Sequence, residues 1–314
     1  MAIAALIGAF TAQAQPTFPT RPVRMVIAFT AASETDQLAR TLGQKLSEQW
    51  GQPIVFDNRP GGGGVTASSV VAKAPPDGYT LLMTTSAHVV APALHASLPY
   101  DALRDFDPIT QVAGVPNVLI ASQQLGVTSV AELIALAKQK PGQLTFGSAG
   151  IGSGMHINAE QFLLDADIKV THVPYKGGPE ALTDVLAGRL SFVFMPMGLV
   201  KPLLADKRIV ALGVTTPARA AALPDVPSIA ESGLPGFEYD GWYGLFAPAG
   251  TPQPVLQQIA SDVARALASA EVKDKYALRG AVPKAGTPQQ FDRFVREEAE
   301  KLKKLVNSAG LQKQ

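Results

Sequence analysis

Two serines in a glycine-rich stretch are the residues best placed to do covalent chemistry. The stretch reads Gly-Ser-Ala-Gly-Ile-Gly-Ser-Gly and contains Ser148 and Ser153, and His156 follows it. A serine nucleophile on a strand-to-helix elbow needs a glycine two residues before it, where this chain has Phe146 and Ile151. A secreted serine hydrolase that uses Ser148 or Ser153, with His156 as its base, is therefore our alternative interpretation and not the first.

The histidines do not form a metal-binding pattern. His88, His95, His156 and His172 lie far apart in the chain, and no His-Glu-x-x-His sequence is present. The chain has no cysteine, which excludes disulfides, thiol nucleophiles and zinc ligation by thiolates. We predict no catalytic residue, no metal site and no cofactor.

The same glycine-rich stretch is suited to binding an anion. It follows a strand-like segment and precedes a helix-like one, so the backbone N–H groups near Ser148, Ala149 and Gly150 point toward a possible ligand. A second turn of this kind, at residues 30–36, reads Thr-Ala-Ala-Ser-Glu-Thr-Asp. Two such turns predict a clamp for a small anion, although each turn is also compatible with an ordinary capped helix start.

The composition describes a globular chain without an affinity for nucleic acid. Of 314 residues, 46% are hydrophobic and 17% are charged, and the formal net charge is +1. Disordered chains have fewer apolar residues, and nucleic-acid-binding chains carry a strong basic excess. We expect about two domains of ordinary size and no nucleic-acid partner.

Strand-like and helix-like segments alternate along the chain. Predicted strands cover residues 23–29, 54–56, 80–84, 118–121, 144–146, 169–173, 192–195, 209–214 and 243–247. A helix is indicated by Leu38, Leu42, Leu46 and Trp50, which recur every four residues. Capping sequences at Ser129, Ser228 and Thr287 predict further helix starts, whereas the glycines at 61–64 are interpreted as a mobile turn. The alternation predicts an α/β fold with largely parallel sheets.

The first residues resemble a secretory signal. An apolar run at residues 2–10 precedes Ala12-Gln13-Ala14, so cleavage is expected before Gln15. Because no basic residue precedes Arg21, we interpret residues 1–14 as the remnant of a longer signal peptide. The alternative is a helical N-terminus. Export of a chain without cysteine predicts a periplasmic protein.

The chain resembles the Bug family of periplasmic substrate-binding proteins, the receptors of tripartite tricarboxylate transporters. Matching stretches occur in order at residues 19–24, 35–40, 57–64, 76–81, 100–106, 147–150, 172–177 and 241–248. The resemblance implies a type II periplasmic binding protein fold, with two lobes joined by a hinge of two crossover strands. We place lobe 1 at residues 15–117 and 236–314 and lobe 2 at residues 118–235.

The resemblance also implies a function and a site. It implies a monomeric receptor that binds a small carboxylate (a di- or tricarboxylate, an aromatic acid or an amino acid) between the lobes. The receptor would deliver this ligand to transporter membrane subunits, or present it to a membrane sensor kinase. The expected ligand-binding residues are Thr30, Ala31, Ala32, Ser33, Thr35, Asp36, Gly63, Thr85, Ser86, Ser148, Ala149, Gly150, Tyr175, Lys176 and Met195.

One departure from the family pattern concerns the ligand. Family members usually have an aromatic residue followed by Pro and Gly-Gly, where this chain has Phe29-Thr30-Ala31-Ala32-Ser33 and then Glu34. Glu34 beside the site is expected to repel a second carboxylate or to attract an amine. Met195 and Met197 are expected either to face the cleft or to lie in the core.

Overall fold

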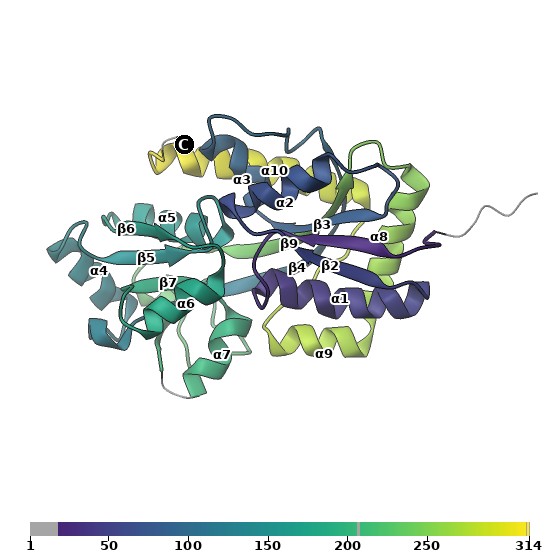
Figure 1. Ribbon diagram of the computed structural model, residues 1–314. Coiled ribbons are helices and arrows are strands. Elements are labelled where there is room, and N and C mark those ends of the chain that lie inside the picture. Colours follow the sequence, from purple (N-terminus) through teal and green to yellow (C-terminus); the bar gives the residue numbers. More distant parts are fainter. Residues whose placement is uncertain (1–17, 206–207, 312, 314) are drawn as a thin grey trace, which may run out of the picture.

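The computed structural model describes residues 18–205, 208–311 and 313, and these residues form two α/β lobes side by side (Figure 1). The predicted signal remnant at residues 1–14 lies outside the described residues. The strands are β1 (Val23–Ile27), β2 (Ile54–Asn58), β3 (Thr80–Thr85), β4 (Phe106–Ala121), β5 (Thr145–Ser148), β6 (Thr171–Pro174), β7 (Phe192–Pro196), β8 (Val210–Val214), β9 (Asp240–Pro248) and β10 (Val282–Pro283).

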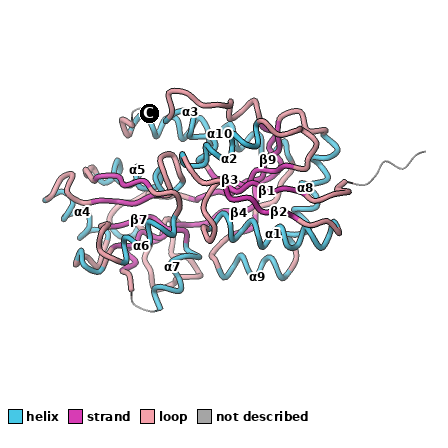
Figure 2. Tube along the Cα trace, viewed as in Figure 1, coloured by secondary structure: helices cyan, strands magenta, loops and turns pink. Residues whose placement is uncertain are grey.

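Helices cover the strands of both lobes. The α-helices are α1 (Glu34–Trp50), α2 (Val65–Ala72), α3 (Ala87–Leu94), α4 (Val130–Gln139), α5 (Gly154–Ala166), α6 (Gly178–Leu186), α7 (Met197–Ala205), α8 (Gln253–Ala268), α9 (Ala270–Leu278) and α10 (Pro288–Ser308). Short 3-10 helices are η1 (Gly62–Gly64), η2 (Gln123–Leu125) and η3 (Ala230–Ser232). Figure 2 shows the strands inside each lobe and the helices outside them.

One long strand connects the two lobes. Strand β4 pairs with β9 as far as Pro116, and from Asn117 onward it pairs with β7, with β8 on its other side from Val118. Lobe 1 is built on the order β2-β1-β3-β9-β4 with β10 beside β4, and lobe 2 on β8-β4-β7-β5-β6. The change of partner at Asn117 and the return of the chain near Tyr239 support our predicted boundaries, which stay predictions.

The sheets are mixed, which corrects the expectation of largely parallel pairing. Strand β1 is parallel to β2 and β3, and β5 is parallel to β6 and β7. Strands β4 and β9 are antiparallel to all of their partners. Neighbouring parallel strands are joined by a crossover connection, usually a helix. Strands β4 and β9 each cross from one lobe to the other, so neither needs such a connection.

The core follows the two-residue period of the strands. Met25 and Ile27 of β1 pack in the cluster with Leu38 and Leu42 of α1, whereas Val26 packs in the cluster on the opposite face. This alternation places α1, α8 and α9 on one side of the lobe 1 sheet and α2, α3 and α10 on the other (Figure 1). The predicted leucine stripe of α1 is therefore its buried face.

Helix starts follow the predicted caps with one exception. Thr287 and Gln290 form a complete capping box at α10. Ser129 caps α4, while the Glu132 carboxylate accepts from Thr128 N instead of Ser129 N. Ser228 accepts from Glu231 N, but the segment it begins is the 3-10 helix η3 and not an α-helix.

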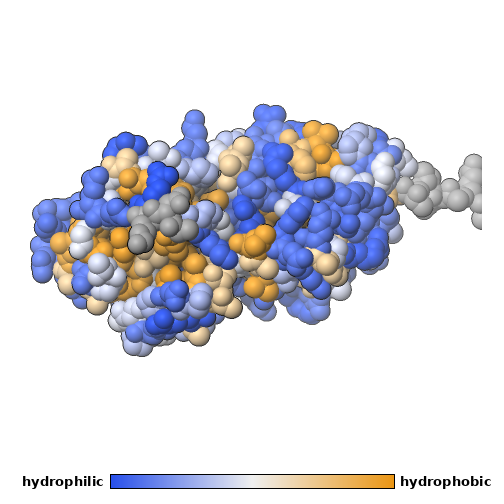
Figure 3. All heavy atoms as spheres, turned by 90° about the horizontal axis from the view of Figure 1, so that it is seen from below, coloured by the Kyte–Doolittle hydropathy of each residue, from blue (hydrophilic) through white to orange (hydrophobic). Residues whose placement is uncertain are grey.

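The molecular surface differs between the lobes on the face that Figure 3 shows. Apolar residues gather over lobe 2, at the left, and the lobe 1 surface is mostly hydrophilic. Among the described helices, none has both the length and the apolar character required to cross a membrane.

Candidate functional site

A cavity lies where the two lobes meet. It encloses about 510 Å³ of empty space, including the part open to solvent. Its wall consists of Phe29, Ser33, Glu34, Thr35, Thr85, Ser86, Asn117, Ala149, Ser153, Gly154, Met155, Gly178, Pro196, Leu199, Tyr239, Gly241, Trp242 and Tyr243. These residues come from both lobes and from the hinge between them.

The wall contains the N-terminal ends of several helices. Ser33 caps α1 and Ser153 caps α5, and each hydroxyl accepts from the backbone N–H three residues later. Ser86 precedes α3, and Gly178 is the first residue of α6. Helix N-termini present unpaired N–H groups and the positive end of the helix dipole. Since no Lys or Arg is among the described residues of this wall, these N-termini supply its positive potential.

The predicted turn at residues 30–36 contributes only part of its residues to the cavity. Ser33 and Thr35 lie in the wall, whereas Thr30, Ala31 and Ala32 do not. Ala31 and Ala32 are exposed, and Ala32 has a φ of 63°, in the left-handed region. The turn therefore reaches the cavity through the first residues of α1.

Asp36 holds this turn in place and does not face the cavity. Its carboxylate accepts hydrogen bonds from Ala32 N, Arg40 Nε and Asn58 Nδ2. Burial alone would raise the pKa of Asp36, but the hydrogen bonds from Arg40, Asn58 and Ala32 outweigh it and lower this pKa. Asp36, expected among the ligand-binding residues, therefore anchors the turn at residues 30–36.

Glu34 is an acid in the cavity wall. Only 2% of its surface is exposed, and Arg279 Nε lies 3.1 Å from its Oε1. Burial raises the pKa of Glu34 to about 7, although the positive charge of Arg279 acts in the opposite direction. The cavity therefore carries a carboxyl group that titrates near neutral pH.

The glycine-rich turn of lobe 2 reaches the cavity through Ala149. Ser148 is fully buried, and its Oγ accepts from Gly150 N and lies 2.6 Å from His172 Nε2. Ser148 and Gly150 are not in the wall. This corrects the expectation that the Ser148 hydroxyl contacts the ligand directly, because that hydroxyl is already paired inside lobe 2.

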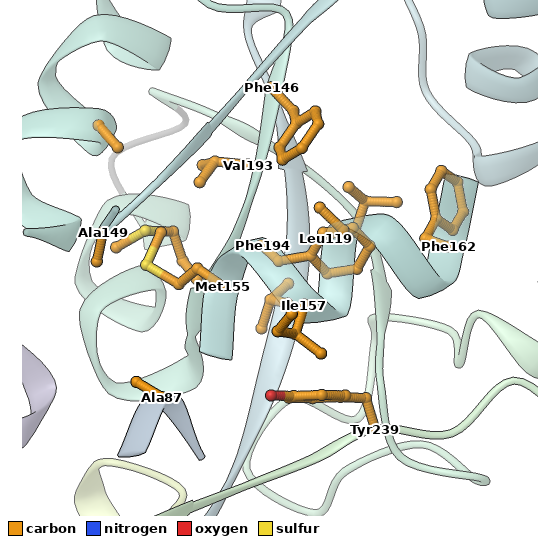
Figure 4. Packing of buried hydrophobic residues seen from close by; sticks show 14 of the residues in the cluster. Ala87, Leu119, Phe146, Ala149, Met155, Ile157, Phe162, Val193, Phe194 and Tyr239 are labelled. Atoms are coloured by element: carbon orange, nitrogen blue, oxygen red, sulfur yellow. The ribbon is translucent and has the colours of Figure 1, made fainter. Parts of the chain in front are cut away.

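The next helix of lobe 2 supplies residues that the sequence did not indicate. Met155 of α5 lies in the cavity wall together with Ala149 and Tyr239, and Figure 4 labels all three side chains. The Tyr239 hydroxyl lies 3.3 Å from Ser86 Oγ. Met155 thus provides an apolar surface next to this polar pair.

Among the expected residues not yet described, Thr85 and Ser86 lie in the wall. The other four, Tyr175, Lys176, Met195 and Gly63, do not. Tyr175 donates to Asp184 Oδ2 inside lobe 2, and Lys176 is exposed. Met195 is fully buried, so the core interpretation of this methionine holds.

Gly63, the fourth of these residues, forms a contact between the lobes. It is buried, and a Cβ at this position would lie 2.0 Å from Ile151 O of lobe 2. The glycines at 61–64, predicted as a mobile turn, instead include the 3-10 helix η1 packed against the opposite lobe.

The hydrolase alternative requires the His156 imidazole to pair with Ser148 or Ser153, and the structure shows neither pair. Ser153 Oγ accepts from the backbone N–H of His156, and the His156 imidazole accepts from Gly152 N through Nδ1. Ser148 approaches His172 instead, and His172 stacks on His156 with ring centroids 4.1 Å apart. Burial lowers the pKa of His172 to about 3, with a further contribution from His156.

Within the described part of the chain, no three His, Cys, Asp or Glu residues cluster as metal ligands do.

The remaining wall residues stand where sequence patterns do not mark a binding residue. Asn117 and Tyr239 come from the hinge, where no local pattern marks a binding residue. Gly241, Trp242 and Tyr243 stand in a stretch that carries the family resemblance, and that stretch was the one available signal. Phe29, Gly154, Gly178, Pro196 and Leu199 border strand ends and helix starts.

Known proteins resemble this chain over nearly its whole length. A "UPF0065 protein in tcbD-tcbE intergenic region" of Pseudomonas sp. strain P51 is 36% identical over 98% of this chain and 91% of its own length. The solved structure of R. palustris Rpa4515 with adipate has 38% identity and a TM-score of 0.91, and the match covers 95% of this chain and 100% of that one. The periplasmic binding protein BugD has 29% identity and a TM-score of 0.90, with 95% and 100% of the two chains covered.

The family model described as "Tripartite tricarboxylate transporter family receptor" matches residues 38–311. Together with the two-lobe fold and the interlobe cavity, this match shows that the chain belongs to the Bug family of solute-binding receptors of tripartite tricarboxylate transporters.

Proposed function

We propose that this protein is a periplasmic receptor that captures a small organic carboxylate between its lobes and delivers it to the membrane subunits of a tripartite transporter. One observation carries the proposal: helix N-termini from both lobes border a single cavity. Backbone N–H groups at helix N-termini bind anions without a side-chain cation. The relative Rpa4515, whose structure contains adipate, supports an organic acid as the ligand class.

Closure of the lobes is the step that would couple binding to delivery. Ser33 and Ser153 lie in the same wall although they belong to different lobes. A ligand that contacts both N-termini stabilises the closed arrangement, because it loses one set of contacts when the lobes separate. Membrane subunits that recognise the closed form would then receive only loaded receptor.

The proposal is tested by adding a negative charge to the cavity without removing a helix cap. Aspartate caps helices as well as serine does, so Ser33→Asp preserves the start of α1 and places a carboxylate in the wall. Binding is measured by isothermal titration calorimetry with acetate, benzoate, nicotinate, hexanoate, adipate and malate. We expect at least one acid to bind the unmodified protein, with a loss of a hundredfold or more in the variant.

Ser129→Asp is the matched control, because Ser129 caps α4 outside the cavity wall. This variant should retain the affinity of the unmodified protein. Equal affinity in Ser33→Asp, or binding of no acid by the unmodified protein, would contradict the proposed site.

A further inference from the structure

Glu34 and Arg279 form an ion pair between the cavity wall and the outer side of lobe 1. Glu34 is the first residue of α1, and Arg279 follows α9 as its C-terminal cap. The side chain of Glu34 is 2% exposed and that of Arg279 is 21% exposed. The only Asp or Glu among the described wall residues is Glu34.

The opposite lobe completes the surroundings of this carboxylate. A Cβ at Gly198, in the first turn of α7, would lie 3.0 Å from Glu34 Oε2 and 2.8 Å from Arg279 Cβ. The carboxylate of lobe 1 is thus in contact with the opening turn of a nine-residue helix of lobe 2. A guanidinium and a helix N-terminus are two groups that favour a carboxylate.

The Glu34 carboxylate oxygens can accept hydrogen bonds that the described residues do not provide. Oε1 and Oε2 are buried, and neither makes a hydrogen bond within the described part of the chain. The 3.1 Å approach of Arg279 Nε is an ion pair without hydrogen-bond alignment. A buried carboxylate that has an ion-pair partner but no aligned hydrogen bond is costly, so a role in ligand selection is a reason for its presence.

We propose that Glu34 occupies the place of a second ligand carboxylate, so that the cavity selects acids with one carboxylate and an uncharged far end. This inference rests on the proposed function. A dicarboxylate would have to compete with Glu34 for Arg279 and for the first turn of α7, and would place two negative charges together. A monocarboxylate leaves the Glu34–Arg279 pair intact.

The rest of the wall suits an apolar far end. Phe29, Met155, Pro196, Leu199 and Trp242 line the cavity with aromatic and aliphatic surface. Burial of such surface stabilises a bound ring or a short alkyl chain. The ligand class is therefore an aromatic or short aliphatic monocarboxylate.

Three acids of equal chain length test this selectivity. Hexanoate has an uncharged far end, adipate has a second carboxylate and 6-aminohexanoate has an amine. By calorimetry at pH 8, we expect hexanoate to bind the unmodified protein at least tenfold more tightly than adipate. In Glu34→Gln the ratio of the two affinities should fall by tenfold or more. Glu297→Gln on the exposed face of α10 makes the same charge change away from the cavity and should leave the ratio unchanged.

The pH dependence of the unmodified protein gives a second test that needs no variant. The groups around Glu34 include Arg279, Tyr243 and Tyr276, with Lys201 and Lys275 near Arg279. Burial raises the pKa values of both tyrosines, so Tyr243 and Tyr276 stay uncharged between pH 6 and 8. Adipate affinity relative to hexanoate should then fall as the pH rises through about 7, where Glu34 ionises.

The outcomes separate this inference from the function on which it rests. An unchanged ratio in Glu34→Gln together with a flat pH profile would overturn the selectivity, while binding of hexanoate or adipate would leave the receptor function standing. Tighter binding of 6-aminohexanoate than of hexanoate would show that Glu34 attracts an amine, which also overturns the inference. If neither the three acids nor the wider panel bound, both proposals would be wrong.

Discussion

Thr30 of lobe 1 and Gly177 of lobe 2 contact each other across the cleft. A Cβ at Gly177 would lie 2.1 Å from Thr30 Oγ1 and 3.2 Å from Thr30 Cβ. Gly177 has a φ of −165° and a ψ of 167°, an extended conformation that any residue adopts. The space between the lobes, and not the backbone, therefore requires glycine at this position.

The first prediction is that Gly177→Ala opposes lobe closure. Overpacking of a filled contact costs about 1–3 kcal/mol, so we expect ligand affinity to fall about tenfold or more. The stability of the unliganded protein should change less, because within lobe 2 the new methyl group meets the end of the flexible Glu180 side chain, at 2.8 Å. Calorimetry and thermal unfolding measure the two effects.

A second substitution makes this prediction specific. Thr30→Ala removes the oxygen that the new methyl group would meet, and should restore part of the affinity when combined with Gly177→Ala. Gly286→Ala is a control, because the nearest atom to its Cβ is Gln290 Oε1 of the α10 capping box, at 3.1 Å, and not an atom of the opposite lobe. Equal losses in the single and double variants would exclude the steric explanation.

The sequence predicted the elements well wherever a segment is buried. The strand expected at residues 192–195 is β7, and the leucine stripe of α1 is its buried face. The part of β4 before Val118 was not predicted, because Pro108, Gly114 and Pro116 interrupt the apolar pattern of this segment. A strand that leaves one lobe for the other changes its neighbours along its length, and no single period describes it.

Local patterns predicted the helix starts at the site but not their partners. Ser33, Thr85 and Ser86 lie in the wall because each stands at or near the start of a helix that points into the cleft. Ser148 stands at a strand end with the same local signal, yet His172 of the neighbouring strand pairs with its hydroxyl. Such a pairing depends on tertiary structure, which sequence spacing does not record.

A further prediction concerns the backbone of Ala32. Its φ of 63° lies in the left-handed region, which costs an L-residue about 1–2 kcal/mol and costs glycine little. Glycine also makes the unfolded chain more flexible, which offsets about 0.4–1 kcal/mol of this gain. Ala32→Gly should therefore raise the free energy of unfolding by about 0.5–1 kcal/mol, as measured in urea. Ala31→Gly lacks the left-handed φ and should lower it; a loss of stability in both variants would contradict the argument.

Glu34 should make the folded protein less stable as the pH rises. Burial raises its pKa from the ordinary value of 4.5 to about 7 in the folded state. The folded protein thus holds the proton more tightly, and this contribution is lost between about pH 4.5 and 7. Relative to Glu34→Gln, the unmodified protein should lose about 2 kcal/mol between pH 5 and pH 8. Urea unfolding of both proteins measures the difference, and a constant difference across this range would show that Glu34 is not perturbed by folding.

His88 should change the stability over an overlapping pH range but with the opposite sign. It is buried, its Nε2 lies 2.8 Å from Ala102 O, and burial lowers its pKa from 6.5 to about 4. The unfolded chain then binds the proton more tightly, so stability present above pH 6.5 is lost as the pH falls toward 4. His88→Gln removes this titration and retains a donor for Ala102 O, and the unmodified protein should lose about 2 kcal/mol more than this variant between pH 7 and pH 5. Because His172 is present in both proteins, it cancels in the comparison, and parallel pH profiles would mean that His88 is accessible to protons in the folded state.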